Sequence, residues 1–276
     1  MQYKLVCSDI DGTLLNKDRV LSKRTIEAIK SIKHNIPILL VSSRMPKAMR
    51  HLQKDLDIMK DPLIAYNGGL IIDYEDDEEK VMFSEEISLD VTGLVLQFVE
   101  SSNIHISLYH KDEWYVPEMD YWAEREQNNT KVTPEVANLK EIHQFWMNEQ
   151  KGPHKIMCMG DAVEIQLLYN YLQTHHAETI HAYRSKDTYI EIASKKISKL
   201  SALNYLMKQK YPQLNLSEVV AFGDNYNDEE MIGDVGMGVA VANARDEVKE
   251  VANRITLGNK EDGVAIMLEE IFSKSM

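Results

Sequence analysis

The feature of this sequence that most limits its fold is a set of short apolar runs that do not alternate with polar residues. They lie at positions 3–8, 36–41, 62–66, 217–223 and 236–242, and helical patterns such as 21–34 and 46–56 separate them. Strands of a parallel sheet are apolar throughout, because helices cover both faces of the sheet. The pattern therefore predicts an α/β fold with a parallel-sheet core and helices on both faces.

The middle of the chain has a different pattern. Between positions 84 and 192 the strand-like segments are more polar, and apolar and polar residues alternate along them. Alternation is typical of a sheet with one covered face and one open face. We therefore predict an α+β domain at 84–192 that is inserted into a core domain made of 1–83 and 193–276.

Charge and composition limit the classes of partner. The 276 residues are 44% hydrophobic and carry a formal net charge of −13, which argues against nucleic acid or an anionic membrane as the main partner. A small anionic ligand stays possible, because a local site can be positive. Two cysteines in apolar runs, no apolar stretch near the ~20 residues of a membrane span and no signal-peptide pattern predict a cytoplasmic protein. The oligomeric state is not indicated.

Acidic residues follow two of the predicted parallel strands. Asp9 and Asp11 come directly after the run at 3–8, and Asp224 and Asp228 follow the run at 217–223. An Asp-Gly turn alone would explain the first pair. However, ligands collect at the carboxyl ends of strands in open α/β sheets, so the four acids are expected to meet. Their convergence predicts a Mg²⁺ site, with one carboxylate left for chemistry. The nine histidines show no metal-ligand spacing and are expected on the surface or in the core.

Two further polar residues fit the same edge of the sheet. Ser42 directly follows the apolar residues 36–41 and offers a hydroxyl group to phosphate oxygens, although a serine here also suits the entry of a helix. Lys199 begins a helical pattern after the inserted segment, and its ammonium group could bind a phosphoryl group. The alternative for Lys199 is an ordinary solvated lysine.

These segments together resemble a known family. DIDGTLL, VSSR, the lysine of ISKLSAL and GDNYND are similar, in order, to the four motifs of the haloacid dehalogenase superfamily. The insertion resembles the type IIB cap of the Cof-like phosphatases, and YNGG at 66–69 and GMGVAVANA at 236–244 also resemble that branch. The resemblance implies a Rossmann-like core with an α+β cap.

The chain departs from the family pattern at two motifs. Ser42, Ser43 and Arg44 stand where this branch usually has Thr-Gly-Arg, and the motif lysine is followed by Leu200 rather than glycine. Serine keeps the hydroxyl group of threonine. Because Lys195 and Lys196 lie close upstream, the choice of lysine among the three stays open.

The resemblance implies a role for each motif residue. Asp9 would be the nucleophile that forms an aspartyl-phosphate, and Asp11 would be the general acid and base. Mg²⁺ would be held by Asp9, Asp224 and the backbone carbonyl of Asp11, with Asp228 supporting the metal shell. The residues expected to contact the phosphate or the rest of the substrate are Ser42, Ser43, Arg44, Asn67, Gly68, Lys199 and Asn227.

We therefore predict a Mg²⁺-dependent phosphatase that acts on a small phosphorylated metabolite, either a sugar phosphate or a phosphorylated cofactor. One alternative is a phosphoryl transferase of the same superfamily, such as a sugar phosphomutase. Another is a non-catalytic protein that binds a small ligand, although such a protein has no need for Asp11.

Overall fold

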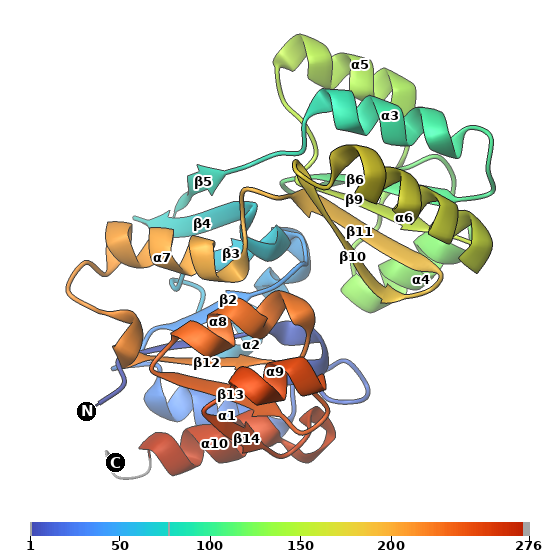
Figure 1. The fold of residues 1–276 in the computed structure, drawn as a ribbon. Helices are drawn as coiled ribbons and strands as arrows, with labels where there is room; N and C mark the ends of the chain where they lie inside the picture. Colours follow the sequence, from blue (N-terminus) through green and yellow to red (C-terminus); the bar gives the residue numbers. More distant parts are fainter. Residues whose placement is uncertain (1, 77, 273–276) are drawn as a thin grey trace. The chain divides into compact units, whose positions relative to one another are not determined.

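The chain forms two compact units in a computed structural model that describes residues 2–76 and 78–272 (Figure 1). Unit 1 consists of Met1–Ser43, Met49–Phe83 and Ser198–Met276, and unit 2 consists of Arg44–Ala48 and Ser84–Ile197. Each unit has its own sheet and its own helices.

Unit 1 contains an eight-stranded sheet in the order β14-β13-β12-β1-β2-β3-β4-β5. The five pairs from β14 to β3 are parallel, and β4 runs antiparallel to β3. The predicted α/β fold with a parallel sheet is confirmed. The strands are β1 (Leu5–Ser8), β2 (Ile38–Val41), β3 (Leu63–Ala65), β4 (Leu70–Glu75), β5 (Glu78–Ser84), β12 (Val219–Gly223), β13 (Met237–Val241) and β14 (Arg254–Thr256).

The continuous apolar runs form the strands because these strands are covered on both sides. Every residue of β1, β2, β3 and β12 is buried. The helices of unit 1 pack in two groups, one containing α1, α2 and α10 and the other containing α7, α8 and α9. They are α1 (Lys23–Ile32), α2 (Arg50–Leu56), α7 (Lys199–Lys210), α8 (Glu229–Asp234), α9 (Asp246–Val251) and α10 (Gly263–Phe272).

The strand order contains a topological switch point between β1 and β12. From β1 the chain proceeds through α1 to β2, and from β12 it proceeds through α8 to β13 on the opposite side. Both crossovers join parallel strands and are expected to be right-handed, so they place α1 and α8 on opposite faces. Open α/β sheets bind ligands outside the carboxyl ends of the strands at such a switch point, and here these strands are β1 and β12.

Short single-turn segments connect several of these elements. Most of them lie next to strands of unit 1, and Pro46–Ala48 lies in unit 2. The segments are η1 (Ile10–Leu14), η2 (Pro46–Ala48), η3 (Tyr66–Gly68), η4 (Leu216–Glu218), η5 (Tyr226–Asp228) and η6 (Asn259–Glu261).

Unit 2 contains a six-stranded sheet in the order β10-β11-β9-β6-β7-β8, in which the pair β7 and β8 is parallel and the other pairs are antiparallel. The alternating segments form this sheet, and Ile106 and Leu108 of β6 point into a core that also contains Trp146. The elements are α3 (Leu89–Val99), β6 (His105–His110), β7 (Glu113–Val116), α4 (Tyr121–Thr130), β8 (Glu135–Val136), α5 (Leu139–Glu149), β9 (Lys155–Met159), α6 (Ala162–His176), β10 (Ile180–Lys186) and β11 (Tyr189–Ser194).

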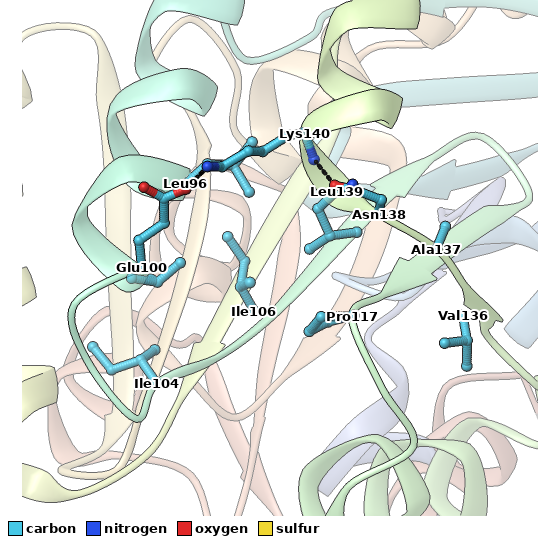
Figure 2. Close-up of a pocket in the computed structure, with 11 residues that line it drawn as sticks. Leu96, Glu100, Ile104, Ile106, Pro117, Val136, Ala137, Asn138, Leu139 and Lys140 are labelled. Atoms are coloured by element: carbon cyan, nitrogen blue, oxygen red, sulfur yellow. Dashed lines mark hydrogen bonds and ion pairs between the residues drawn. The ribbon is translucent and has the colours of Figure 1, made fainter.

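Unit 2 also has an open, mainly aliphatic groove of about 610 Å³ (Figure 2). Leu96 of α3, Ile106 of β6 and Leu139 of α5 contribute to its lining. An ion pair between Glu100 and Lys140 lies at the groove. This lining suits apolar contact and not phosphate chemistry.

Within residues 2–76 and 78–272, no helix has both the length and the apolar character to cross a bilayer.

Candidate active site

The site begins where β1 and β12 end, at the switch point of the unit 1 sheet. Asp9 directly follows β1, and its backbone N–H donates to the carbonyl oxygen of Phe222 in β12 at 3.0 Å. Asp224 directly follows β12. The parallel pairing of the two strands therefore brings together two acids that lie far apart in the sequence.

A tight turn at Ile10–Leu14 connects β1 to the rest of the site. Gly12 has a φ of +87°, a conformation that residues with a Cβ rarely adopt, and a Cβ there would lie 2.3 Å from Oδ2 of Asp224. The Thr13 hydroxyl donates to Oδ1 of Asp224 at 3.0 Å. The glycine thus permits, and the threonine stabilises, close contact between the two acid-bearing loops.

Lys199 connects the acids through its side chain. It is the first residue of α7, which begins after the cap residue Ser198, and it is buried. Its Nζ donates to Oδ1 of Asp9 and to Oδ1 of Asp228, both at 2.6 Å. The other two lysines that the sequence left open lie elsewhere, since Lys195 donates to Ala177 and Lys196 pairs with Glu85.

Asp228 is fully buried and organises the loop after β12. Its Oδ2 accepts hydrogen bonds from the backbone N–H groups of Asp224 and Asn225, both at 3.0 Å, while its Oδ1 accepts from Lys199. At Gly223 a Cβ would lie 2.5 Å from the Cβ of Asp228. Asp228 therefore holds Lys199 and the Asp224 loop in one fixed arrangement.

The electrostatics of the site show an excess of negative charge. One oxygen each from Asp9, Asp224 and Asp228 lie within 4.8 Å of one another. Burial raises the pKa of Asp9 well above its usual range; Lys199 opposes this shift, and the other two carboxylates add to it. Burial and Asp228 raise the pKa of Asp224 to about 7. Burial alone would lower the pKa of Lys199, but Asp228 and Asp9 outweigh it, so that pKa is raised.

Asp11 lies apart from these three acids. Its Oδ1 accepts a hydrogen bond from Nη2 of Arg19 at 2.6 Å, and the two side chains are 37% and 46% exposed, respectively. The predicted meeting of four acids therefore holds for Asp9, Asp224 and Asp228, whose oxygens cluster, whereas Asp11 stands outside this cluster but close enough to Asp224 to add to the rise of its pKa.

Ser42, Asn67 and Asn227 form a second side of the site. Ser42 follows β2, and its carbonyl oxygen accepts from the N–H of Asn67 at 2.9 Å. The side-chain amide of Asn227 donates to Oδ1 of Asn67 at 2.8 Å. A Cβ at Gly68, where φ is +106°, would lie 2.6 Å from the carbonyl oxygen of Ser198. Gly68 therefore permits the start of α7, and with it Lys199, to approach this side.

Ser43 and Arg44 lie at a boundary between the two units. Ser43 ends a segment of unit 1, whereas Arg44 begins the short segment of unit 2. The buried guanidinium group of Arg44 donates to the carbonyl oxygen of Ala48 at 3.2 Å within unit 2.

Sequence reasoning missed four residues that shape the site. Thr13 and Arg19 contact Asp224 and Asp11, respectively, as described above. The side-chain amide of Asn243 donates to the carbonyl oxygen of Gly12 at 2.8 Å, and that of Asn259 donates to Leu15 at 2.7 Å. Thr13 and Asn243 lie inside segments that were recognised as motifs, which was a usable signal. Arg19 and Asn259 carry no local signal.

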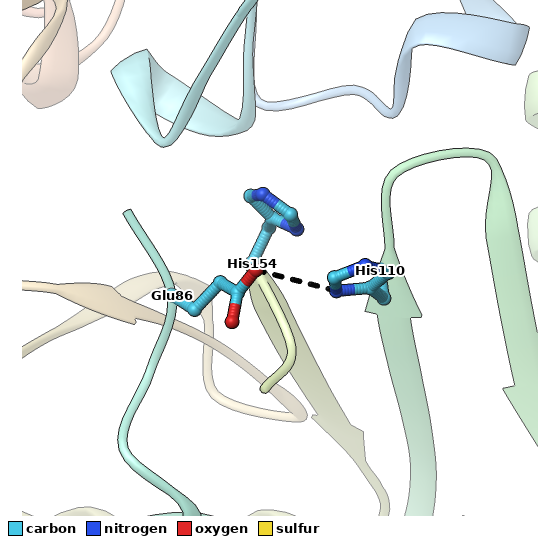
Figure 3. A group of neighbouring side chains, drawn as sticks. All are labelled: Glu86, His110 and His154. Carbon is cyan, nitrogen blue, oxygen red and sulfur yellow. Dashed lines mark ion pairs between the residues drawn. The ribbon is translucent and has the colours of Figure 1, made fainter. Parts of the chain in front are cut away.

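A second cluster with metal-ligand chemistry lies in unit 2 and consists of Glu86, His110 and His154 (Figure 3). The backbone of Gly152 binds two of them: its N–H donates to Oε2 of Glu86 at 2.6 Å, and its carbonyl oxygen accepts from Nδ1 of His110 at 2.7 Å. These bonds hold Glu86 and His110 in place without a metal ion.

His154 is committed to hydrogen bonds in the same way. The N–H of Lys111 donates to Nδ1 of His154 at 3.3 Å, so the ring proton lies on Nε2, which donates to the hydroxyl oxygen of Ser84 at 3.0 Å. Burial lowers the pKa of His154 to about 3, and the neighbouring His110 contributes to this shift. We interpret the cluster as a hydrogen-bond network.

Comparisons with known proteins agree with the fold. A family model described as haloacid dehalogenase-like hydrolase matches residues 6–268. A putative phosphatase from Haemophilus influenzae is 33% identical and aligns over 99% of both chains. The 5-amino-6-(5-phospho-D-ribitylamino)uracil phosphatase YitU from Bacillus subtilis is 29% identical, over 98% of this chain and 97% of its own.

Solved structures agree as well. A haloacid dehalogenase-like hydrolase from Bacteroides thetaiotaomicron has a TM-score of 0.87 and 30% identity, over 98% of this chain and 100% of its own. TM0651 from Thermotoga maritima has a TM-score of 0.84 and 26% identity, over 97% of both chains. The class of protein is therefore a phosphatase, an enzyme that hydrolyses phosphoric monoesters. The chain belongs to the haloacid dehalogenase-like hydrolase family, as its four motifs predicted.

Proposed function

We propose that this phosphatase depends on Mg²⁺ and hydrolyses a small phosphorylated metabolite through an aspartyl-phosphate on Asp9. The observation that carries the proposal is the buried contact of Lys199 with Asp9 and Asp228 at the switch point of the sheet. A nucleophilic carboxylate, a cation for phosphoryl oxygens and an acid cluster for a metal meet at one place.

The acid cluster fits a divalent cation. Three carboxylates lie around one buried ammonium group, and burial together with the neighbouring carboxylates raises the pKa values of Asp9 and Asp224. Mg²⁺ prefers oxygen ligands of this kind. Asp9, Asp224 and the backbone carbonyl of Asp11 would hold the ion, and Asp228 would support them from the side of Lys199. When bound, Mg²⁺ would reduce the repulsion between Asp9 and the anionic phosphate.

The residues of the chain would carry out the two chemical steps. A carboxylate oxygen of Asp9 attacks the phosphorus atom, and the bond between phosphorus and the alcohol oxygen breaks. Asp11 donates its proton to that departing oxygen. Asp11 then removes a proton from a water molecule, which attacks the phosphorus atom, releases inorganic phosphate and regenerates Asp9.

The transferred group would be held by polar residues from three separate segments of the chain. Ser42, Lys199 and Asn227 would contact the phosphoryl oxygens, since such reactions depend mostly on positioning and charge stabilisation. The contacts among Ser42, Asn67 and Asn227 support a preorganised pocket. Ser43, Arg44, Asn67 and Gly68 complete the set that we propose for substrate binding.

The proposed substrate is a sugar phosphate or a phosphorylated cofactor. The phosphorylated ribitylaminouracil in the name of the relative from Bacillus subtilis belongs to this chemical range. We further propose that residues 84–192 form a cap domain that selects the substrate. The two buried free cysteines, Cys7 and Cys158, support a cytoplasmic location.

A screen of phosphorylated metabolites for release of inorganic phosphate tests this function. Asp9→Asn is the matched control, because it keeps the shape of the side chain and removes the nucleophile. We expect phosphate release from at least one alkyl phosphate with the parent enzyme and none with the variant. An isomeric sugar phosphate as the product would instead identify a phosphomutase, and activity retained in Asp9→Asn would contradict the proposed mechanism.

A further inference from the structure

The ion pair between Asp11 and Arg19 has a consequence for the proposed acid step. Both residues belong to unit 1, and Nη2 of Arg19 lies 2.6 Å from Oδ1 of Asp11. A hydrogen bond between two charged groups at this distance is among the stronger side-chain contacts. It acts directly on the carboxyl group that would donate and accept the proton.

The loop that carries Arg19 is built to present this side chain. Oδ1 of Asn16 accepts from the N–H groups of Asp18 at 2.9 Å and Val20 at 3.2 Å, and the N–H of Arg19 donates to the carbonyl oxygen of Asn16 at 3.0 Å. Arg19 has a φ of +58°, which is uncommon for a residue with a Cβ. The hydrogen bonds of the loop thus hold Arg19 in a conformation that it would otherwise rarely adopt.

The backbone next to Asp11 is held by other groups. Asn243 binds the carbonyl oxygen of Gly12 at 2.8 Å, and Leu15 donates to Ile10 at 3.0 Å across the turn. The loss of Arg19 should therefore leave the turn intact and remove one restraint on the side chain of Asp11.

We propose that Arg19 is a positioning residue that holds the carboxyl group of Asp11 for proton transfer. The inference rests on the proposed acid role of Asp11. The aspartate side chain has several staggered conformations, and its ion pair with Arg19 favours one of them. Because proton transfer requires the donor within hydrogen-bond reach of the departing oxygen, the rate of the acid step depends on this restraint.

The test is Arg19→Gln, measured by single-turnover release of the leaving group from two substrates. One is the best alkyl phosphate of the screen, whose alkoxide needs protonation, and the other is 4-nitrophenyl phosphate, whose leaving group does not. We expect a selective loss of about two- to fivefold on the alkyl phosphate, in line with a half-exposed ion pair. Both substrates carry the same phosphate charge. A weaker attraction between the enzyme and the phosphate would therefore slow both reactions equally and cancel in the ratio of the two rates. Arg19→Lys should restore part of the loss.

The decisive comparison combines Arg19→Gln with Asp11→Asn. If Arg19 acts through Asp11, its substitution has no further effect once the carboxyl group is absent. Arg24→Gln is the matched control, because Arg24 is an equally exposed arginine of unit 1 that pairs with Glu269 at 2.6 Å. In Arg24→Gln the ratio of the rates on the alkyl phosphate and on 4-nitrophenyl phosphate should equal that of the parent enzyme.

Three results would overturn the inference: equal losses on both substrates, a gain on the alkyl phosphate, or an effect of Arg19→Gln that persists in the Asp11→Asn background. The failure of the proposed function is recognised separately. If Asp11→Asn alone loses both substrates equally, the acid role of Asp11 is wrong, and the inference about Arg19 falls with it. If Asp11→Asn shows the selective loss and Arg19→Gln does not, only the inference fails.

Discussion

Lys199 donates a 2.6 Å hydrogen bond to Asp9, although 190 positions separate the two residues in the sequence. Both side chains are buried, and the same ammonium group also binds Asp228. The contact therefore joins the end of the first strand of the sheet to the start of α7 and to the loop after β12. The stability of the site and its proposed chemistry both depend on this one amine.

Lys199→Met should destabilise unit 1 at neutral pH and abolish turnover. Removal of one partner of a buried ion pair leaves its carboxylates uncompensated, which costs about 3–5 kcal/mol. Urea unfolding followed by circular dichroism would measure the loss. Lys196→Met is the control, because that amine is exposed and its pair with Glu85 contributes little. Unchanged stability of Lys199→Met would contradict the importance that we assign to the contact.

Chelation should abolish turnover, and added Mg²⁺ should restore it. Ca²⁺ should inhibit, because it favours larger oxygen shells that disturb the geometry of Asp9 and Asp224. Mg²⁺ should also raise the melting temperature in a concentration-dependent manner, since it binds only the folded site. Asp224→Asn should weaken this thermal shift. Full turnover in excess chelator, or an equal shift in the variant, would exclude the proposed metal site.

His154 should make the stability of unit 2 depend on pH. Burial lowers its pKa to about 3, below the ordinary value of 6.5, so protonation favours the unfolded chain. The contribution of the unprotonated His154 to the free energy of unfolding is complete above pH 6.5 and is lost as the pH falls towards 3. The loss in the free energy of unfolding should reach about 2 kcal/mol at pH 5, and it should be absent in His154→Gln.

Tryptophan fluorescence suits this measurement, because all three tryptophans, at positions 114, 122 and 146, lie in unit 2. His175→Gln provides the control, because His175 is an exposed histidine of α6 in the same unit. If His154→Gln kept the pH dependence of the parent, another group would be responsible.

Asp61 should have the opposite effect in unit 1. Burial raises the pKa of Asp61 from 3.8 to about 6. The hydrogen bond from the N–H of Ile38, at 3.0 Å, acts in the opposite direction and lowers the pKa, but by less. The contribution of Asp61 to the free energy of unfolding is therefore greatest below pH 3.8. This contribution is lost as the pH rises through 6. Asp61→Asn keeps an acceptor for Ile38 and should be about 1–2 kcal/mol more stable at pH 8.

The gain from Asp61→Asn should disappear near pH 4, where the parent side chain is protonated in the folded state. Urea unfolding at the two pH values measures the difference, and Asp55→Asn, at an exposed position of α2, is the control. A gain of equal size at both pH values would show that ionisation of Asp61 is not the cause.

The sequence by itself determined the fold class and the family. Continuous apolar runs such as 36–41 predicted buried parallel strands, because only such strands are covered on both faces, and four short motifs predicted the haloacid dehalogenase-like family. It also placed Asp9 and Asp224 directly after strands, and the neighbouring positions of β1 and β12 bring these acids together.

Only the tertiary structure decided which side chains contact one another. The sequence favoured Lys199 but left Lys195 and Lys196 open, and the path of the chain into α7 determines which amine reaches Asp9. The pairs Arg19 with Asp11 and Asn227 with Asn67 depend on a left-handed backbone residue and on loops from distant segments. The physical reason is that periodicity and strand ends are local properties of a chain, whereas a hydrogen bond between side chains depends on the path of every segment between them.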